Sequence, residues 1–366
     1  MQKPNTLVIV FTMLLDQEQR DWLALSLVPG VGTAHFIRLL ARFRTATNVL
    51  AAREKDLREI VGPKLAQRVA QYAEASDVQT QESLMQEYGA ELITLNDTRY
   101  PLRLAEIYDP PLALFVRGQL MEHDERSVAI VGTRKATPYG VRTAERLARE
   151  LTARGVTVVS GLAAGIDAAA HSGAIDAGGR TIAVLGCGVD SVYPANHGEL
   201  MHRVIQNGAV LSQFPMGMKP LKGNFPYRNR IISGMTLGTI VVQAPGSSGA
   251  LITAHTALEQ GREVFAVPGE VGHRNSVGPH KLIREGAKLV ETADDVLAEL
   301  DLAIESAPEP VSLADVDSVG ARNQDRPSST AATLSSDNRA TVAAPGSPHE
   351  RAILATLRQD GSFVDE

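Results

Sequence analysis

The sequence predicts an α/β protein with an extended Rossmann-like, mostly parallel sheet, helices on both faces, and a small all-α domain before it. Three observations predict this class. Residues 14–80 show short helical patterns. From residue 127, continuous apolar runs alternate with helix-length segments, which is typical of strands buried on both faces. Most of these runs end in glycine, at the point where such sheets bind ligands.

Length and composition set the outer limits. The chain has 366 residues, of which 44% are hydrophobic, enough for two or three domains with buried cores. Its single cysteine, Cys187, excludes an internal disulfide framework and a cysteine-based zinc site. The histidines fall in no metal-binding spacing. We therefore expect a cytoplasmic protein without a metal.

The N-terminal segment carries no targeting pattern. The apolar run Leu7–Leu15 is too short to cross a bilayer, so we expect a tail over residues 1–13 and no membrane partner. In the helical domain that follows, "LVPGVGTAHFIRLL" (27–40) places Gly30 and Gly32 in a tight turn between helices. The amides of such a turn could face a phosphate, or the domain could simply pack against its neighbour.

The predicted sheet follows within a domain that we place at residues 81–302. Its strands are "SVAIVG" (127–132), "VTVVSG" (156–161), "TIAVLGCG" (181–188), "TIVVQAPG" (239–246) and "EVFAVPG" (263–269). Residues 303–348 hold too few large apolar side chains to fold, so we expect a disordered linker. Residues 349–366 begin an amphipathic helix, which we interpret as the truncated start of a further module.

Charge is distributed unevenly. The formal net charge is −6, yet no Asp or Glu occurs from 126 to 144 or from 200 to 258. Both segments carry several Lys and Arg residues. Because the local field steers a polyanion more than the net charge does, these segments are candidates for nucleic-acid contact.

The first candidate motif is "GTRKATPYG" (132–140), between a strand and a helix. Gly132 allows close approach of a ligand, Thr133 offers a hydroxyl, and Arg134 can bind a phosphate near the start of the next helix. The alternative is a tight turn with a solvated arginine. The motif is not a dinucleotide fingerprint, and no acidic residue ends the next strand, so we expect no cofactor.

The second motif is "SGLAAGIDAAAH" (160–171). Gly161 leaves room for a ligand backbone. Asp167 and His171 are four residues apart on one helix face, but neither a nucleophile nor a metal partner accompanies them. We therefore interpret them as structural and expect no catalytic residue.

The third motif, "APGSSGALITA" (244–254), is similar to the P-G-G-x-G-T-x-x-E loop of nucleotide phosphoribohydrolases. Thr253 stands where those enzymes have their acid-base glutamate, and a hydroxyl cannot replace that carboxylate. The loop, with Ser248 and Gly249, is then an anion cradle without a catalytic group.

The fourth segment is "GNFPYRNRIISG" (223–234), preceded by Lys222. If a helix begins at Pro226, Phe225, Arg228 and Asn229 share one side and could form a surface for bases and phosphates. Arg230 points away and could instead lie in an internal salt bridge. The segment is either a DNA-binding surface or core architecture.

Together these motifs resemble the DprA/Smf family, the DNA-processing proteins of natural transformation. The resemblance also covers "RYPLRLAEIYDPPLALFVRG" (99–118), "GCGVDSVYPANH" (186–197), "SGALITAHTALEQGREVFAVPG" (248–269) and "LIREGA" (282–287). It implies a SAM-like or helix-hairpin-helix domain at 14–80 and an extended Rossmann domain. It also implies single-stranded DNA binding without strong sequence preference, a homodimer through the Rossmann domain, and delivery of DNA to the RecA recombinase.

The resemblance also implies site residues. The family's Gly-Ser-Arg turn is similar to Gly132, Thr133 and Arg134, and its Lys before F-P-x-R-N-R is similar to Lys222. Two positions depart from the family pattern, since a usual glutamate is Gln243 and a usual asparagine is His280. The piece at 349–366 is similar to the first helix of the family's winged helix. Two alternatives to DNA binding stay open: an N-glycosidase of the phosphoribohydrolase type and a mononucleotide sensor.

Overall fold

The structure is a computed structural model that describes residues 15–72, 77–300 and 302. The segments expected to be a tail (1–13), a linker (303–348) and the start of a further module (349–366) lie outside the described residues. Within the described part, none of the helices has both the length and the apolar character needed to cross a membrane.

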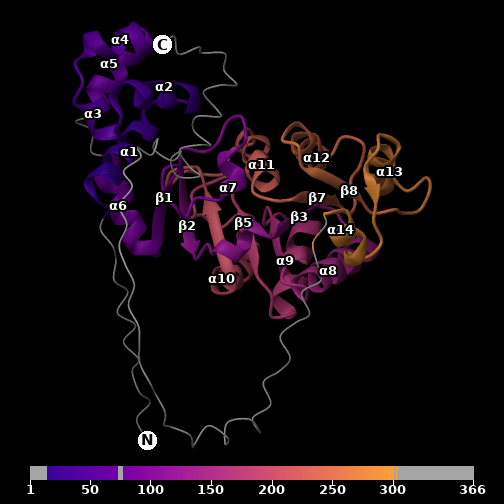
Figure 1. Ribbon diagram of the computed structural model, residues 1–366. Helices are drawn as coiled ribbons and strands as arrows, with labels where there is room; N and C mark the ends of the chain where they lie inside the picture. The colour runs from indigo at the N-terminus through magenta and orange to yellow at the C-terminus, as the bar shows by residue number, and fades with distance from the viewer. Residues whose placement is uncertain (1–14, 73–76, 301, 303–366) are drawn as a thin grey trace, which may run out of the picture.

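The N-terminal region is helical, as the sequence predicts, and lies beside one edge of the sheet (Figure 1). Asp16 starts the first helix through a capping box with Gln19, which satisfies amides that the helix itself cannot. The helices are α1 (Gln17–Leu27), α2 (Thr33–Phe43), α3 (Ala46–Leu50), α4 (Glu54–Val61), α5 (Pro63–Tyr72) and α6 (Asp77–Tyr88).

A nine-stranded sheet follows, in the order β1-β2-β6-β5-β4-β3-β7-β8-β9. All pairings from β6 to β9 are parallel, whereas β1 and β2 are antiparallel at one edge. The strands are β1 (Ala90–Thr94), β2 (Ala113–Gly118), β3 (Ser127–Val131), β4 (Thr157–Ser160), β5 (Thr181–Val184), β6 (Gly208–Ser212), β7 (Gly238–Val241), β8 (Glu263–Ala266) and β9 (Lys288–Leu289). The predicted Rossmann-like fold is confirmed, and β1, β2, β6 and β9 are additions to the five expected strands.

Helices cover both faces, because the central strands are continuous apolar runs and present apolar side chains to either side of the sheet. Val128 and Ile130 of β3 pack with α8 (Pro138–Thr152), α9 (Ile166–Asp176) and α14 (Ala293–Glu299). Ala129 and Val131 belong to the opposite core, with α11 (Asn224–Gly234) and α12 (Gly249–Glu259). Figure 1 shows α11 and α12 above the sheet and α8 and α9 below it. The remaining helices are α7 (Leu102–Ala105), α10 (Gly198–Gln206) and α13 (Val277–Arg284).

The strand order reverses between β3 and β7. Strands β3 to β6 are added one after another in one direction, and the chain then returns to place β7 on the other side of β3. The loops that follow β3 and β7 therefore diverge and leave a crevice at the carboxyl ends of the strands. This reversal determines where a ligand can enter the sheet.

The helical region shares its core with the sheet. Trp22 of α1 donates from Nε1 to the carbonyl of Leu112, at 2.7 Å, and Thr33 donates to the carbonyl of Pro110, at 2.9 Å. Apolar side chains from both regions form one continuous buried cluster. The N-terminal helices are therefore fixed on the antiparallel edge of the sheet.

A buried ion pair fixes the amino ends of β4 and β5. Asp124 is 6% exposed and accepts from Arg180 at 2.7 and 2.9 Å. It also accepts from the Thr157 hydroxyl at 2.9 Å and the Met121 amide at 2.8 Å. Each carboxylate oxygen thus has two donors, as a buried charge requires.

We predict that Asp124→Ala lowers the free energy of unfolding by about 3–5 kcal/mol, because it leaves Arg180 without its carboxylate. Asp176→Ala is the matched control, since it removes a carboxylate from Arg203 in a pair whose side chains are 36% and 52% exposed. The control should cost less than about 1 kcal/mol. Equal losses in urea unfolding would show that the Asp124 pair does not stabilise the fold.

Candidate nucleic-acid interface

A cavity of about 330 Å³ opens at the strand reversal. We call it the switch-point cavity. The turn after β3, the loop after β7 and the first turns of α11 and α12 form its walls. Its lining includes Gly132, Thr133, Arg134, Asp167, Phe225, Arg228, Asn229, Ser248, Gly249 and Thr253. Most of the residues singled out from the sequence therefore meet in one place.

The turn after β3 is held by main-chain contacts. The Thr133 amide donates to the carbonyl of Gln243 at 2.7 Å, and the Ile166 amide donates to the carbonyl of Thr133 at 3.2 Å. A Cβ on Gly132 would lie 2.5 Å from the Ile166 side chain, so only glycine fits this close approach. The turn leaves Arg134 and Lys135 exposed to solvent. It can thus present positive charge without moving.

Phe225 places an aromatic ring at the cavity wall. The guanidinium carbon of Arg134 lies 5.3 Å from the centre of this ring, and the Tyr193 ring centre also lies 5.3 Å away. Phe225 is partly exposed. A cation over an aromatic face is electrostatically favourable. The same pair can stack a base on the ring and bind the neighbouring phosphate with the guanidinium.

Arg228 belongs to the lining of the cavity but is almost fully buried. It is 4% exposed, and its Nη1 donates to the carbonyls of Gly161, at 2.9 Å, and of Val184. Burial lowers the pKa of Arg228 to about 10, and the negative charge of Asp167 opposes that shift. All three residues of the predicted surface line the cavity, but Arg228 binds strand ends and leaves Phe225 and Asn229 as the more exposed members. Their contact with a nucleic acid stays a prediction.

Gly161 is fitted to this arginine. A Cβ at Gly161 would lie 2.6 Å from Nη2 of Arg228. The absence of a side chain at Gly161 therefore makes room for the internal guanidinium of Arg228. Gly161 is not among the residues that line the cavity, and its predicted contact with a ligand stays a prediction.

Asp167 and His171 are buried beside Arg228 and make internal hydrogen bonds. Asp167 accepts from the Ala163 amide at 3.4 Å, and His171 Nδ1 lies 2.7 Å from the Thr181 hydroxyl. Burial raises the pKa of Asp167 to about 6, although Arg228 opposes this shift. Burial lowers the pKa of His171 to about 3, and the positive charge of Arg228 adds to that effect. Their partners are the main chain and a hydroxyl, which is consistent with a structural role.

The loop after β7 ends in the start of α12. Ser248 caps this helix by accepting from the Ala250 amide at 3.3 Å, and Gly249 is exposed. Thr253 is buried, and its hydroxyl lies 3.5 Å from the carbonyl of Gly249. This wall of the cavity is therefore the start of α12. Thr253, which stands where nucleotide phosphoribohydrolases have a glutamate, contributes a hydroxyl there.

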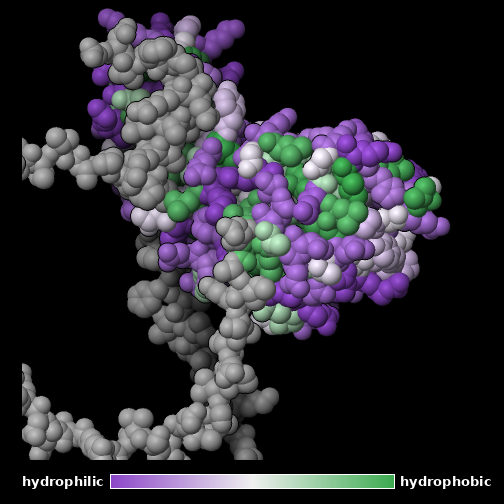
Figure 2. Space-filling view, turned by 45° about the vertical axis from the view of Figure 1, so that its right-hand side comes forward, coloured by the Kyte–Doolittle hydropathy of each residue, from purple (hydrophilic) through white to green (hydrophobic). Residues whose placement is uncertain are grey.

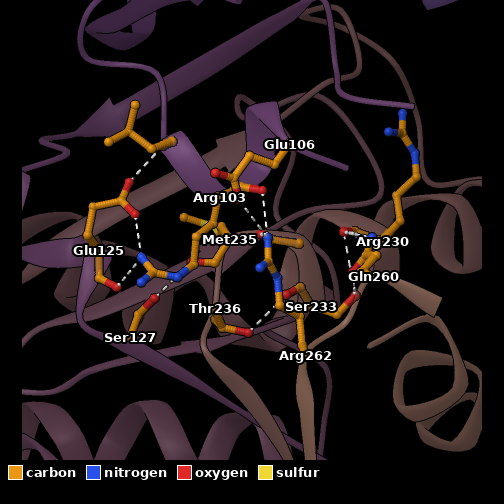
Figure 3. A network of polar contacts seen from close by, with 12 residues as sticks. Arg103, Glu106, Glu125, Ser127, Arg230, Ser233, Met235, Thr236, Gln260 and Arg262 are labelled. Atoms are coloured by element: carbon orange, nitrogen blue, oxygen red, sulfur yellow. Dashed lines mark hydrogen bonds and ion pairs between the residues drawn. The ribbon is translucent and has the colours of Figure 1, made fainter. Parts of the chain in front are cut away.

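Contacts at its far end hold α11 in place (Figure 3). The Ser233 hydroxyl donates to Gln260 at 2.6 Å, and the Gln260 amide donates to the carbonyl of Arg230 at 2.9 Å. Nearby, Arg262 donates to the carbonyl of Arg103 at 2.8 Å. These contacts connect α11 to α12 and α7. The C-terminal half of α11 is therefore fixed against the neighbouring helices.

Arg230 makes the internal ion pair that was one of its two expected roles. Its Nη2 lies 3.5 Å from the carboxylate of Asp109, and its side chain is 12% exposed. The helix itself begins at Asn224, two residues before the expected Pro226. The Asn224 amide donates to the carbonyl of Leu221 at 3.0 Å in the turn that leads into the helix, and the Asn224 side chain donates to the carbonyl of Gly186, also at 3.0 Å.

Two residues at or beside the cavity were not predicted from the sequence. Arg274, from the segment after β8, lines the cavity. Tyr193 is not part of the lining, but it is 37% exposed and packs against the Phe225 ring. Tyr193 lies in "GCGVDSVYPANH" (186–197), so its aromatic character was a usable signal, whereas no local pattern marks Arg274. Lys222 is exposed just before α11.

The departure at Gln243 has a structural account. Its side-chain oxygen accepts from the Thr137 amide at 3.0 Å, and its side-chain nitrogen donates to the Thr137 hydroxyl at 2.9 Å. A glutamate could not donate to that hydroxyl. Among the residues that the structure describes, no group of three acidic, His or Cys side chains could hold a metal ion.

The chain is similar in sequence and in fold to known proteins. A family model described as DNA recombination-mediator protein A matches residues 91–301. The chain is 42% identical over 257 residues to DNA processing protein DprA of Bacillus subtilis, which covers 70% of this chain and 82% of that protein. The structure resembles the X-ray structure of DprA from Streptococcus pneumoniae with a TM-score of 0.69 and 36% identity, covering 78% of this chain and 99% of that chain.

A second solved structure is also similar. It is a structure of DNA processing protein A from Helicobacter pylori, described as giving insights into a unique single-stranded DNA binding mode. It has a TM-score of 0.53 and 29% identity, and covers 60% of this chain and 98% of that one.

The shifted pKa values predict an unusual pH dependence. Below about pH 6 the folded state binds a proton at Asp167 that the unfolded state, with a pKa near 3.8, does not, so this group favours folding as pH falls. His171 acts in the opposite direction below pH 6.5, because only the unfolded state binds its proton until about pH 3. Between about pH 4 and 6 the two effects nearly cancel.

We predict that Asp167→Asn removes this compensation. The free energy of unfolding of the variant should fall, relative to wild type, by about 1.4 kcal/mol for each pH unit from 6 to 4. Urea unfolding at several pH values measures this difference, and Asp176→Asn at an exposed position is the control. Parallel curves for wild type and Asp167→Asn would contradict the assigned pKa of Asp167.

Proposed function

Since the chain belongs to the DNA recombination-mediator protein A family, also named DprA or Smf, we propose that it binds single-stranded DNA at the switch-point cavity and transfers it to RecA. The binding is independent of sequence, and the protein protects incoming DNA during transformation and recombination. It works in the cytoplasm, without a cofactor.

The observation that carries this proposal is the pair of Arg134 and Phe225. A guanidinium 5.3 Å from a ring centre offers one phosphate contact and one stacking face side by side. Only a strand with unpaired bases presents both groups to such a site. Every base has a π-face and every nucleotide has a phosphate, so this arrangement supports binding that tolerates any sequence.

Neighbouring groups extend the positive surface. Lys135 and Lys222 are exposed on the β3 turn and just before α11, and Ser248 and Gly249 start α12 with its positive dipole end. The similar Helicobacter pylori protein is described with single-stranded DNA as its ligand. Extending that ligand to this chain is part of the proposal.

We also propose a homodimer through the Rossmann domain. Exposed apolar side chains occur on the elements toward the β9 end of the sheet: Leu258 on α12, Val277 on α13 and Leu289 on β9. Figure 2 brings this end of the molecule forward and shows apolar groups gathered among hydrophilic ones. Pairing of two copies here would remove these groups from water.

An N-glycosidase is the alternative that the loop after β7 suggests. Thr253 is buried at the position of the enzyme carboxylate, and its hydroxyl already contacts the carbonyl of Gly249. Asp167 also lines the cavity, but its carboxyl group is buried and hydrogen-bonded to the main chain. A hydroxyl at position 253 and a carboxyl that is already hydrogen-bonded favour ligand binding over catalysis.

A titration of labelled oligonucleotides tests the binding proposal. Single strands should bind more tightly than duplexes of the same length, with affinity largely independent of sequence. If each protomer neutralises roughly 3 to 5 phosphates, the log-log salt slope should be about −2 to −3.5. Arg134→Ala should weaken binding and flatten the slope by roughly 0.7, because it removes one phosphate contact. Equal affinity for duplex, or a slope near zero, would contradict the proposal.

An incubation with nucleoside monophosphates separates binding from catalysis. We expect no release of free base, because the residues at the cavity supply no acid-base carboxylate at position 253. A mononucleotide that saturates the site as tightly as an oligonucleotide would instead favour the sensor. Base release that disappears in a Thr253→Val variant would favour the glycosidase.

A further inference from the structure

A second cavity, of about 180 Å³, lies where the N-terminal helices meet the sheet. We call it the seam pocket. Gly32 and Thr33 at the start of α2 line one side, and Gln213 after β6 lines another. Tyr227 and Arg230 of α11 complete it. Helix α11 therefore contributes to both cavities: Phe225 and Asn229 line the switch-point cavity, and Tyr227 and Arg230 line the seam pocket.

The polar side chains of this pocket hold donors without acceptors. Nε and Nη1 of Arg230 and Nε2 of Gln213 are buried, and none has a hydrogen-bond partner among the described residues. A buried donor that is left unpaired destabilises the folded state. Buried donors are normally hydrogen-bonded, so three unpaired donors on two side chains of one pocket require an explanation.

The geometry of these donors is fixed. Arg230 donates from Nη2 to Gln213 Oε1 at 2.6 Å, so the amide nitrogen of Gln213 is the group left for another partner. The guanidinium carbon of Arg230 lies 4.3 Å from the centre of the Tyr227 ring. This contact restricts the orientation of the guanidinium plane. Figure 3 shows the Arg230 side chain pointing away from the network at the far end of α11. The donors are therefore organised before any ligand arrives.

A partner for this site must be small and must accept hydrogen bonds. A guanidinium edge and an amide nitrogen match the oxygens of a tetrahedral oxyanion. Asp109, 3.5 Å from Nη2 and 34% exposed, offsets part of the positive charge of Arg230. The α2 start adds the positive end of a helix dipole, and Gly32 supplies no side-chain cap there. The glycine turn at 27–33, which the sequence marked as a possible phosphate contact, thus faces this pocket.

We propose that the seam pocket is a second oxyanion subsite that takes a phosphate group. The phosphate is either free or part of a strand that crosses α11 from the switch-point cavity. The second source rests on the proposed DNA-binding function. The first does not.

Inorganic phosphate is the direct probe. Wild type should gain thermal stability with phosphate relative to chloride at equal ionic strength. Arg230→Lys and Gln213→Leu should lose that gain, with phosphate affinity by calorimetry falling roughly ten-fold or more. Arg262→Lys is the matched control, since Arg262 is another buried arginine with an unpaired Nε but lies at the other end of α11. Gln213→Leu keeps the test valid if Arg230→Lys does not fold.

Single-stranded oligonucleotides distinguish the two sources. If strand phosphates enter the pocket, Gln213→Leu weakens DNA binding several-fold with the salt slope unchanged, because glutamine carries no charge. If only free phosphate enters, DNA affinity is unchanged while the phosphate response is lost. A wild type that does not respond to phosphate, or four proteins that respond equally, would overturn the subsite. Arg134→Ala would still weaken DNA binding in that case, which keeps the proposed function separate.

Discussion

The guanidinium of Arg228 joins α11 to the ends of two parallel strands, and the rest of the candidate site depends on this contact. Its bonds to the carbonyls of Gly161 and Val184 place the start of α11 over β4 and β5. Phe225, one turn earlier, then faces the turn after β3 that carries Arg134. A buried arginine can do this because main-chain carbonyls at strand ends satisfy its donors.

The same contact has an electrostatic cost. Arg228 is 4% exposed, and Asp167 supplies a negative charge near it, although burial raises the pKa of Asp167 to about 6. The positive charge of Arg228 adds to the burial that lowers the pKa of His171 to about 3 and keeps this side chain neutral. Burial and the neighbouring arginine therefore account for the shifted pKa values of both groups without a catalytic role.

Much of this arrangement follows from the sequence, and the part that does not has identifiable reasons. The five central strands are continuous apolar runs, so their type and parallel pairing could be predicted. The two residues of β9 and the segment of β6 carry no distinctive period. The strands end in glycine turns at one edge of the sheet, and this pattern predicts that Gly132, Arg134, Phe225 and Gly249 lie close together. The burial of Arg228 could not be predicted, because helical spacing shows which side of a helix a residue is on but not whether other elements cover that side.

The N-terminal region shows the same limit. Helices and the glycine turn at 27–33 could be predicted from local residues, but the surface that the turn faces is set by contacts distant in sequence. Trp22 and Thr33 bond to the carbonyls of Leu112 and Pro110, and these bonds bring the turn beside Gln213 and Arg230. Long-range packing, rather than local propensity, thus decides which candidate phosphate contacts share a cavity.

The central claim is that Phe225 is a stacking platform beside a phosphate contact, and Phe225→Ala tests it most directly. Single-strand affinity, measured over a range of salt concentrations, should fall by about 1–3 kcal/mol while the salt slope stays that of the wild type, because the ring carries no charge. Phe225→Tyr is the matched control, because it keeps a stacking ring at the same position, and its affinity should stay close to that of the wild type. An unchanged affinity in a Phe225→Ala variant that remains folded would contradict the claim.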